Sequence, residues 1–164
     1  RCQNHPWLSK RNVVCSLAFA PGKIIGMVNL AAWFKRYAWG TSEVEAGVYR
    51  ATFAIETDEE FDLFVFVEDD WVHFAVSPLL TAARDAGLDA LQPVLLKLNQ
   101  SMTAARFALD SDGDINLLAD LPVAGATYAA FAQLLDLLTD YAGRLVGELR
   151  RAGANPGYQS PLFS

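Results

Sequence analysis

Two apolar segments separated by an Asp- and Gly-rich turn constrain this chain more than any other feature. Residues 106–110 and 115–121 flank the turn sequence Ser111-Asp112-Gly113-Asp114. Aspartate tolerates a left-handed backbone and glycine adopts one without a Cβ clash, so the pattern predicts a β-hairpin. Pro122 has no amide hydrogen to donate to a neighbouring strand, so we expect it to end the second strand.

The composition indicates a folded, acidic protein. The chain has 164 residues, 52% of them apolar, which is enough to bury a core. The 13 basic and 19 acidic residues give a net charge of -6. That balance disfavours direct binding to nucleic-acid phosphates and favours a basic protein partner. Cys2 and Cys15 are too few for a disulfide framework, so we expect a reducing compartment.

Residues 1–22 differ from the rest of the chain. Lys10 and Arg11 precede an apolar run over residues 13–20, a pattern that partly matches a signal peptide. The run is short and the preceding residues are polar, which favours a loosely ordered leader or residues foreign to the natural protein. No run is long enough to cross a bilayer. We expect one domain over residues 23–152 and a C-terminal tail over residues 153–164.

Hydrophobic periodicity divides the remaining chain into helices and strands. Pro93 belongs in a first helical turn, so the second helix should begin close to Ala90, and Thr127 should cap the third. We expect Ser77-Pro78 to close the third strand. The predicted helices cover residues 23–39, 88–102 and 127–152, and the strands before the hairpin cover residues 48–56, 61–67 and 71–76.

These elements predict an α+β fold with a five-stranded antiparallel sheet and three helices, in the order α-β-β-β-α-β-β-α. Short connections between consecutive strands favour antiparallel pairing. Residues 61–67 are apolar on both faces, as expected for a strand covered on both sides. Asp136 and Asp140 lie opposite the apolar stripe of the last helix, which comprises Phe131, Leu134, Leu135, Leu138, Ala142, Leu145 and Leu149.

Two groups of side chains are candidates for binding another protein. The first helix is rich in aromatic residues, which either pack on the sheet or form a docking groove. Acidic residues gather between residues 57 and 70, either as solvated turn carboxylates or as an edge that meets a basic partner. The acidic edge would comprise Asp58, Glu59, Glu60 and Asp62.

No motif predicts a catalytic, cofactor or metal site. Residues 110–114 partly match a calcium loop, but Leu121 stands where the loop needs a bidentate Glu. His5 and His73 have no Cys or His partners at zinc-ligand spacing. His73 lies mid-strand near Trp71 and Phe74, and we expect it to be partly buried and hydrogen-bonded. No nucleophile is tied to it by sequence, so a role as a catalytic base has no support.

The second predicted helix, the hairpin and the last helix together resemble the YbjN-like family of bacterial proteins. The resemblance is carried by residues 95–99, residues 106–117 and the Leu121-Pro122 pair before a long helix, and it extends over roughly residues 24–152. That family is similar in fold to the class I chaperones of type III secretion, which are small acidic dimers that hold partly unfolded clients. The resemblance implies a chaperone-like fold, a homodimer, a cytoplasmic location and a protein client.

The resemblance also implies binding residues. In those chaperones the second helix usually forms the dimer contact, and clients lie extended over apolar patches of the sheet and first helix. A symmetric contact places the same patch on both subunits. The implied dimer residues are Leu91, Val94, Leu95 and Leu98, and the implied client-binding residues are Trp33, Phe34, Tyr37, Phe64, Phe66 and Trp71.

Three functional hypotheses follow from these observations. The first is a non-enzymatic, dimeric, chaperone-like adaptor that binds a protein client. The second is an acidic regulatory protein that binds a basic DNA-binding partner, such as a single-strand-binding or DNA-repair protein. The third is an enzyme with an undetected site around His73 and nearby acids. Salt separates the first two, because it weakens electrostatic association more than apolar capture.

Overall fold

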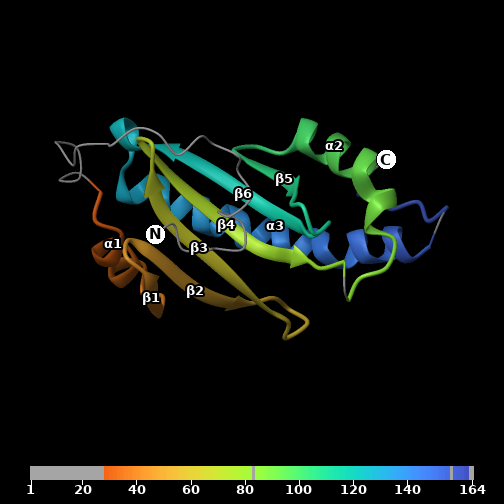
Figure 1. Cartoon of the computed structure of the whole chain (residues 1–164), viewed down its shortest axis with the longest axis horizontal. Helices are drawn as coiled ribbons and strands as arrows, with labels where there is room; N and C mark the ends of the chain where they lie inside the picture. The colour runs from red at the N-terminus through yellow and green to blue at the C-terminus, as the bar shows by residue number, and fades with distance from the viewer. Residues whose placement is uncertain (1–27, 83, 156, 163–164) are drawn as a thin grey trace.

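The computed structural model describes residues 28–82, 84–155 and 157–162 (Figure 1). The predicted leader, and the part of the first predicted helix before Val28, lie outside these residues. The elements are α1 (Leu30–Tyr37), β1 (Thr41–Glu45), β2 (Val48–Ala54), β3 (Glu60–Glu68), β4 (Trp71–Leu80), the 3-10 turn η1 (Leu88–Leu91), α2 (Gln92–Ser101), β5 (Ala105–Leu109), β6 (Ile115–Pro122), the 3-10 turn η2 (Val123–Gly125) and α3 (Tyr128–Ala154).

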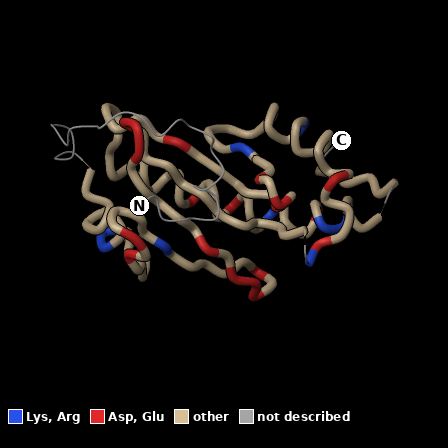
Figure 2. The backbone as a smooth tube through the Cα atoms, in the orientation of Figure 1, with Lys and Arg blue, Asp and Glu red and all other residues tan. Residues whose placement is uncertain are grey.

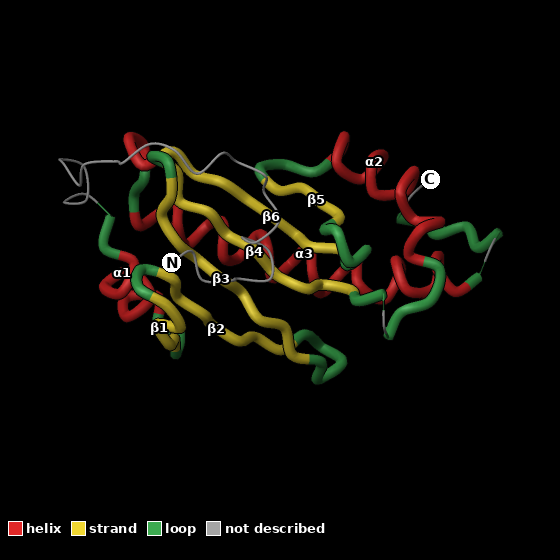
Figure 3. Tube along the Cα trace, in the orientation of Figure 1, coloured by secondary structure: helices red, strands yellow, loops and turns green. Residues whose placement is uncertain are grey.

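All strands of the described residues join one antiparallel sheet in the order β1-β2-β3-β4-β6-β5 (Figure 3). The α+β class, the three helices and the antiparallel pairing are confirmed, but the prediction of five strands is wrong. The additional strand, β1, is exposed along its whole length and therefore has no apolar alternation to reveal it. It forms because Gly47, at φ +77, turns the chain back into β2.

The third predicted strand also continues further than expected. β4 runs through Ser77 and Pro78 to Leu80, so the prediction that these two residues close it is wrong. The pairing of β4 with β6 shifts register between Val76 and Leu80. An irregularity of this kind accommodates a proline because the ladder needs no amide hydrogen there.

The predicted hairpin is confirmed. Strands β5 and β6 pair from Ala105 opposite Ala119 to Leu109 opposite Ile115. In the turn, Asp110 Oδ1 accepts hydrogen bonds from the backbone amides of Asp112 and Asp114 at 2.9 and 3.0 Å. Gly113 adopts φ +83, the left-handed conformation expected of it.

Helix α3 packs its apolar stripe against one face of the sheet (Figure 1). Thr127 caps the helix by accepting a hydrogen bond from the amide of Ala130 at 3.2 Å, as predicted. Phe131 is fully buried, with its ring centroid 5.7 Å from that of Phe74 in β4 and 5.0 Å from that of Phe34 in α1. Helices α1 and α3 therefore share this inner face, and all seven residues of the predicted stripe are buried.

Helix α2 lies beside the edge strand β5. The Asn99 side chain accepts a hydrogen bond from the Phe107 amide at 2.7 Å and donates one to the Phe107 carbonyl at 3.1 Å. It thereby satisfies backbone groups that an edge strand would otherwise present to another chain. Within the described ranges no helix covers the opposite face of the sheet, contrary to the expectation that both faces are covered, and no helix is long and apolar enough to span a bilayer.

The C-terminal end of α3 meets the loop before η1 backbone to backbone. A Cβ atom on Gly153 would lie 2.6 Å from the carbonyl oxygen of Ala86, and one on Gly87 would lie 1.9 Å from that of Gly153. Such separations are too short for any side chain, so both glycines are required by close approach. By contrast, Gly147 in the same helix has nothing within 4 Å of its added Cβ.

We expect Gly153→Ala to lower the free energy of unfolding by about 2 kcal/mol or more, because the added methyl overpacks a backbone contact. The matched variant Gly147→Ala should raise it by about 0.5–1 kcal/mol through helix propensity alone. Urea unfolding followed by circular dichroism measures both values. Equal effects of the two substitutions would contradict the close contact between α3 and the loop.

Candidate functional site

The sheet face opposite α3, here called the outer face, is the main candidate for a binding surface. Side chains alternate between the two faces along each strand, and this alternation decides which residues lie on the outer face. Tyr49 and Phe53 of β2 point to the inner face, where their rings contact Phe34 and Trp39. The neighbouring residues of β2 therefore point to the outer face. The outer face comprises Val48, Arg50 and Thr52 of β2, Phe64 and Phe66 of β3, Trp71, His73 and Ala75 of β4, Leu118 and Asp120 of β6, and Arg106 of β5.

An apolar row crosses the outer face with an arginine at each end. The register places Arg50 opposite Phe64, Phe64 opposite Ala75, Ala75 opposite Leu118, and Leu118 opposite Arg106. Five strands at about 4.8 Å spacing make this row about 19 Å long. Trp71 extends the apolar surface at the end of β4 and is 43% exposed. The outer face therefore offers aromatic and aliphatic contact area between two arginines, each of which lies near a carboxylate of the same chain, Arg50 near Asp62 and Arg106 near Asp120.

His73 belongs to a hydrogen-bonded chain on the outer face, where it lies between Phe66 and Asp120. Its ring stacks on Phe66, with centroids 5.0 Å apart, and its Nδ1 lies 2.7 Å from Asp120 Oδ1. Arg106 contacts the other carboxylate oxygen of Asp120 at 2.6 Å. In the described parts of the chain, no hydroxyl or thiol is hydrogen-bonded to this ring, so the pair is not assembled with a nucleophile.

The six predicted client-binding residues are divided between the two faces of the sheet. Phe34 is fully buried on the inner face, and Trp33 packs on Phe131 with ring centroids 5.4 Å apart. Tyr37 donates a hydrogen bond to Asp136, and burial together with this carboxylate raises the pKa of Tyr37. The other three, on β3 and β4, belong to the outer face. The aromatic residues of α1 therefore serve mainly to pack the helix.

The four predicted dimer residues face the protein core. Leu91, Leu95 and Leu98 are buried within the single chain, and Val94 is half-buried. The exposed leucine of α2 is instead Leu96, at 71% exposure. Sequence reasoning missed it because the periodicity analysis follows the inward stripe, and Leu96 lies about 100° from Leu95 around the helix.

The acidic cluster predicted between residues 57 and 70 separates to the two ends of β3 (Figure 2). At one end, Asp62 accepts a hydrogen bond from Thr52 at 2.8 Å and lies 3.8 Å from Arg50. Glu59 is also ion-paired, whereas Asp58 and Glu60 are exposed. Two of the four predicted acidic partner-binding residues are therefore already paired within the chain.

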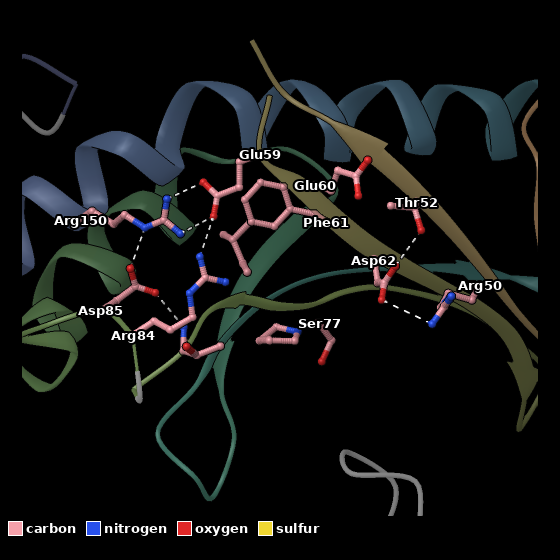
Figure 4. A pocket seen from close by; sticks show the side chains of 13 residues that line it. Arg50, Thr52, Glu59, Glu60, Phe61, Asp62, Ser77, Arg84, Asp85 and Arg150 are labelled. Carbon is pink, nitrogen blue, oxygen red and sulfur yellow. Dashed lines mark hydrogen bonds and ion pairs between the residues drawn. The ribbon is translucent and has the colours of Figure 1, made fainter. Parts of the chain in front are cut away.

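Arg150 of α3 joins the turn between β2 and β3 to the loop after β4 (Figure 4). Its guanidinium donates two hydrogen bonds to Glu59 and one, at 2.6 Å, to Asp85. The hydrogen bond from Arg150 is the main reason that the pKa of Glu59 is lowered, and the same bond raises the pKa of Arg150. These residues line a polar cavity of about 400 Å³. Glu59 and Arg150 are 91 positions apart, so no local sequence signal predicts their pairing.

The arrangement offers no evident centre for metal chemistry. Over the described ranges, no group of three or more His, Cys, Asp or Glu side chains is placed to hold a metal ion. In the hairpin turn, Asp110 Oδ1 instead accepts backbone hydrogen bonds, as expected of an ordinary turn residue.

We expect Arg150→Gln to lower the free energy of unfolding by about 1–3 kcal/mol, because it leaves Glu59 and Asp85 without their shared donor. Arg84→Gln is the control, since Arg84 also approaches Glu59, at 3.7 Å, but is 73% exposed and should contribute less than about 0.5 kcal/mol. Urea unfolding at neutral pH measures both values.

The effect of Arg150→Gln should depend on pH. A carboxyl group whose pKa is lowered by folding stabilises the protein above its unfolded pKa, and this stabilisation is lost as the pH falls through the folded pKa. The difference between wild type and Arg150→Gln should therefore shrink between about pH 5 and pH 3. A difference that is constant over this range would show that the ion pair is not its source.

Comparison with known proteins identifies the family and fold. The model of the YbjN family, described as "Putative bacterial sensory transduction regulator", matches residues 28–151. Comparison with curated protein sequences finds no match. YbjN from E. coli has a similar structure, with 17% identity, a TM-score of 0.53, and coverage of 80% of this chain and 94% of that one.

Two complexes contain similar chains. A chain of the ExsC-ExsE complex gives 17% identity and a TM-score of 0.52, covering 71% of this chain and 90% of that one. A chain of the HopA1-SchA chaperone-effector complex gives 13% identity and a TM-score of 0.50, covering 74% and 89%. The protein belongs to the YbjN family and shares its α+β fold with YbjN from E. coli and with a chain of a chaperone-effector complex.

Proposed function

We propose that this protein is a non-enzymatic, dimeric, chaperone-like adaptor of the cytoplasm that holds an extended segment of a client protein on its outer face. The observation that carries the proposal is the apolar row from Phe64 through Ala75 to Leu118, flanked by Arg50 and Arg106 and extended by Trp71. An apolar strip with charged ends suits a peptide segment better than a small metabolite, which needs an enclosing pocket.

The apolar side chains of this surface supply part of the binding free energy that capture needs. Fully covering an exposed large apolar side chain contributes about 1.5–3 kcal/mol. Trp71 is 43% exposed and Phe64 and Leu118 are half-buried, so together they offer about 2 kcal/mol before the cost of ordering the client. A micromolar complex needs about 8 kcal/mol of net binding free energy. Contacts to the arginines and to the strand backbone would have to supply the remainder. We therefore expect moderate affinity rather than a permanent complex.

Names of structural neighbours are consistent with this class of function. One neighbour belongs to a chaperone-effector complex, and another belongs to a two-protein complex, ExsC-ExsE. At 13% and 17% identity those structures share only the fold with this chain, so a protein client remains part of our proposal. The acidic-regulator hypothesis has less support, because Glu59 and Asp62 of its edge are paired with Arg150 and Thr52.

We further propose that the dimer forms through the outward side of α2. Leu91, Leu95 and Leu98 are already packed inside one chain, whereas Leu96 is 71% exposed beside them. A symmetric dimer through this side of the helix would place Leu96 against the same patch of the partner and remove its side chain from water. This assignment keeps the implied use of the second helix and moves the contact to its other side.

A single substitution on the outer face tests client binding. A peptide can be selected from a random displayed library against the full chain, labelled, and titrated by fluorescence anisotropy. Leu118→Asp should weaken its binding at least about tenfold, equivalent to about 1.4 kcal/mol, because a carboxylate replaces an apolar contact. The control Gln133→Asp, on an exposed position of α3, should leave the affinity unchanged.

Salt distinguishes this mode from capture of a basic partner. Raising sodium chloride from about 50 to 500 mM should weaken the peptide affinity less than it would weaken the affinity of a basic partner for an acidic edge, because apolar contact is only weakly screened. Two results together would favour the acidic-regulator hypothesis instead. Leu118→Asp would bind the peptide as tightly as wild type does, and the double variant Asp58→Asn with Glu60→Gln would no longer bind it.

The oligomeric state tests the α2 contact. Light scattering coupled to size exclusion should give twice the chain mass of 17.9 kDa for wild type and a single chain mass for Leu96→Glu. Val44→Glu, at an exposed apolar position of β1, is the matched control and should remain dimeric. A monomeric wild type, or a Leu96→Glu variant that stays dimeric, would contradict the assignment.

A further inference from the structure

The polar cavity lined by Arg150 combines a ligand-sized volume with a high density of charge. Its volume of about 400 Å³ lies within the range of small-molecule sites, which starts at about 300 Å³. Four carboxylates and three arginines line it, so the formal charges of the lining sum to -1. The carboxylates are Glu59, Glu60, Asp62 and Asp85, and the arginines are Arg50, Arg84 and Arg150. Apart from Arg50, none of these groups takes part in the proposed client surface.

Three of the charged groups neutralise one another and hold the wall of the cavity in place. Arg150 donates two hydrogen bonds to Glu59 and one to Asp85, and these three side chains are 31%, 22% and 10% exposed. The second carboxylate oxygen of Asp85 accepts a hydrogen bond from the Thr81 amide at 3.0 Å. A ligand would therefore meet a wall whose polar groups are already oriented.

Two other charged side chains of the lining remain largely available to a ligand. Arg84 is 73% exposed, and its guanidinium lies 3.7 Å from Glu59, whose carboxylate already accepts two hydrogen bonds from Arg150. Glu60 is exposed and has no ion-pair partner within the described ranges. Figure 4 shows the side chains of Arg84 and Glu60 on opposite sides of Phe61. The cavity therefore offers a cation and an anion at separate places.

Asp62 adds a second carboxylate beside Glu60. The two residues are two positions apart in β3, so their side chains lie on the same face of the strand. Asp62 accepts a hydrogen bond from Thr52 at 2.8 Å, and Arg50 approaches it only to 3.8 Å. The acidic groups outnumber the single arginine at this end of the cavity, so it attracts the ammonium group of a ligand.

The lining also contains a hydroxyl group without a partner. Thr81 Oγ1 is buried and has no hydrogen-bond partner in the described part of the chain. Leaving a buried polar atom unpaired costs free energy, and a peptide group, which both donates and accepts, would recover it.

We propose that this cavity binds a small zwitterion of the dipeptide class, with its carboxylate on Arg84 and its ammonium group on Glu60 and Asp62. A guanidinium presents paired donors that match a carboxylate. Because Phe61 lies between the two charged places in Figure 4, the ligand needs its own charges further apart than a single amino acid holds them. A dipeptide spans up to about 7 Å between its ends.

A ligand with only one charge fits this lining less well. An anion on Arg84 would lie close to the carboxylate of Glu59, and a cation on Asp62 would lie close to Arg50. A zwitterion meets an opposite charge at each end and leaves the net charge of the lining unchanged. The inference does not depend on the proposed client surface.

Isothermal titration calorimetry of the full chain with alanyl-alanine tests the proposal. Two capped relatives keep the peptide group and remove one charge each, since N-acetyl-alanyl-alanine lacks the ammonium group and alanyl-alanine amide lacks the carboxylate. Trialanine is titrated in parallel, because it extends the span to about 11 Å. We expect saturable binding of the dipeptide or tripeptide, and at least about fivefold weaker binding of each capped relative of the peptide that binds.

Two substitutions assign the charged contacts. Arg84→Gln should weaken the uncapped peptide at least about fivefold and leave its amide unaffected, because the amide has no carboxylate to lose. Glu60→Gln should weaken the uncapped peptide and leave its acetylated relative unaffected. Both side chains are exposed, so circular dichroism should show an unchanged fold. The control Arg144→Gln, at a 57% exposed arginine of α3 outside the cavity, should bind as wild type does.

Three results would overturn the proposal. The first is the absence of saturable binding of both uncapped peptides to wild type. The second is a capped relative that binds as tightly as its parent, which would show that the cavity recognises a single charge. The third is wild-type affinity in both Arg84→Gln and Glu60→Gln, which would place the peptide elsewhere on the chain.

Discussion

Contact between the apolar stripe of α3 and the inner face of the sheet is the interaction on which the other features depend. The helix spans 27 residues, and its buried side chains reach from Phe131, next to α1, to Leu149, near the loop before η1. Burying this stripe fixes which face of every strand is internal, because strand side chains alternate. It also fixes the outer face, since the described helices cover only one side of the sheet.

Polar contacts complete this arrangement at the periphery. Arg150 holds the β2–β3 turn and the loop after β4 to α3, while Asn99 satisfies the edge of β5. Both contacts restrict where another chain can pair or insert. The outer face is left as an apolar surface with arginines at its ends, and this combination makes protein docking, rather than small-molecule chemistry, the function that the geometry supports best.

Local signals predicted much of the fold. The Asp-Gly turn, the Thr127 cap and the stripe of α3 depend on neighbouring residues, so their positions followed from the sequence. Strand β1 was missed because all five of its residues are exposed, and the end of β4 was misplaced because a register shift accommodates Pro78.

The candidate site was predicted less completely, because its parts meet only in three dimensions. Phe64 and Phe66 were identified as aromatic, but the face they occupy depends on which side of the sheet α3 covers. The aromatic residues of α1 belong to the other face. The pairing of Arg150 with Glu59 joins positions far apart in the chain, and the outward direction of Leu96 depends on how α2 packs.

The most direct test of the account is hydroxyl-radical footprinting of the full chain with and without a saturating concentration of the selected peptide. The account predicts a change in oxidation at Trp71 and Leu118 and none at Trp33 and Tyr37. Protection of Trp33 and Tyr37 with no change at Trp71 and Leu118 would contradict it.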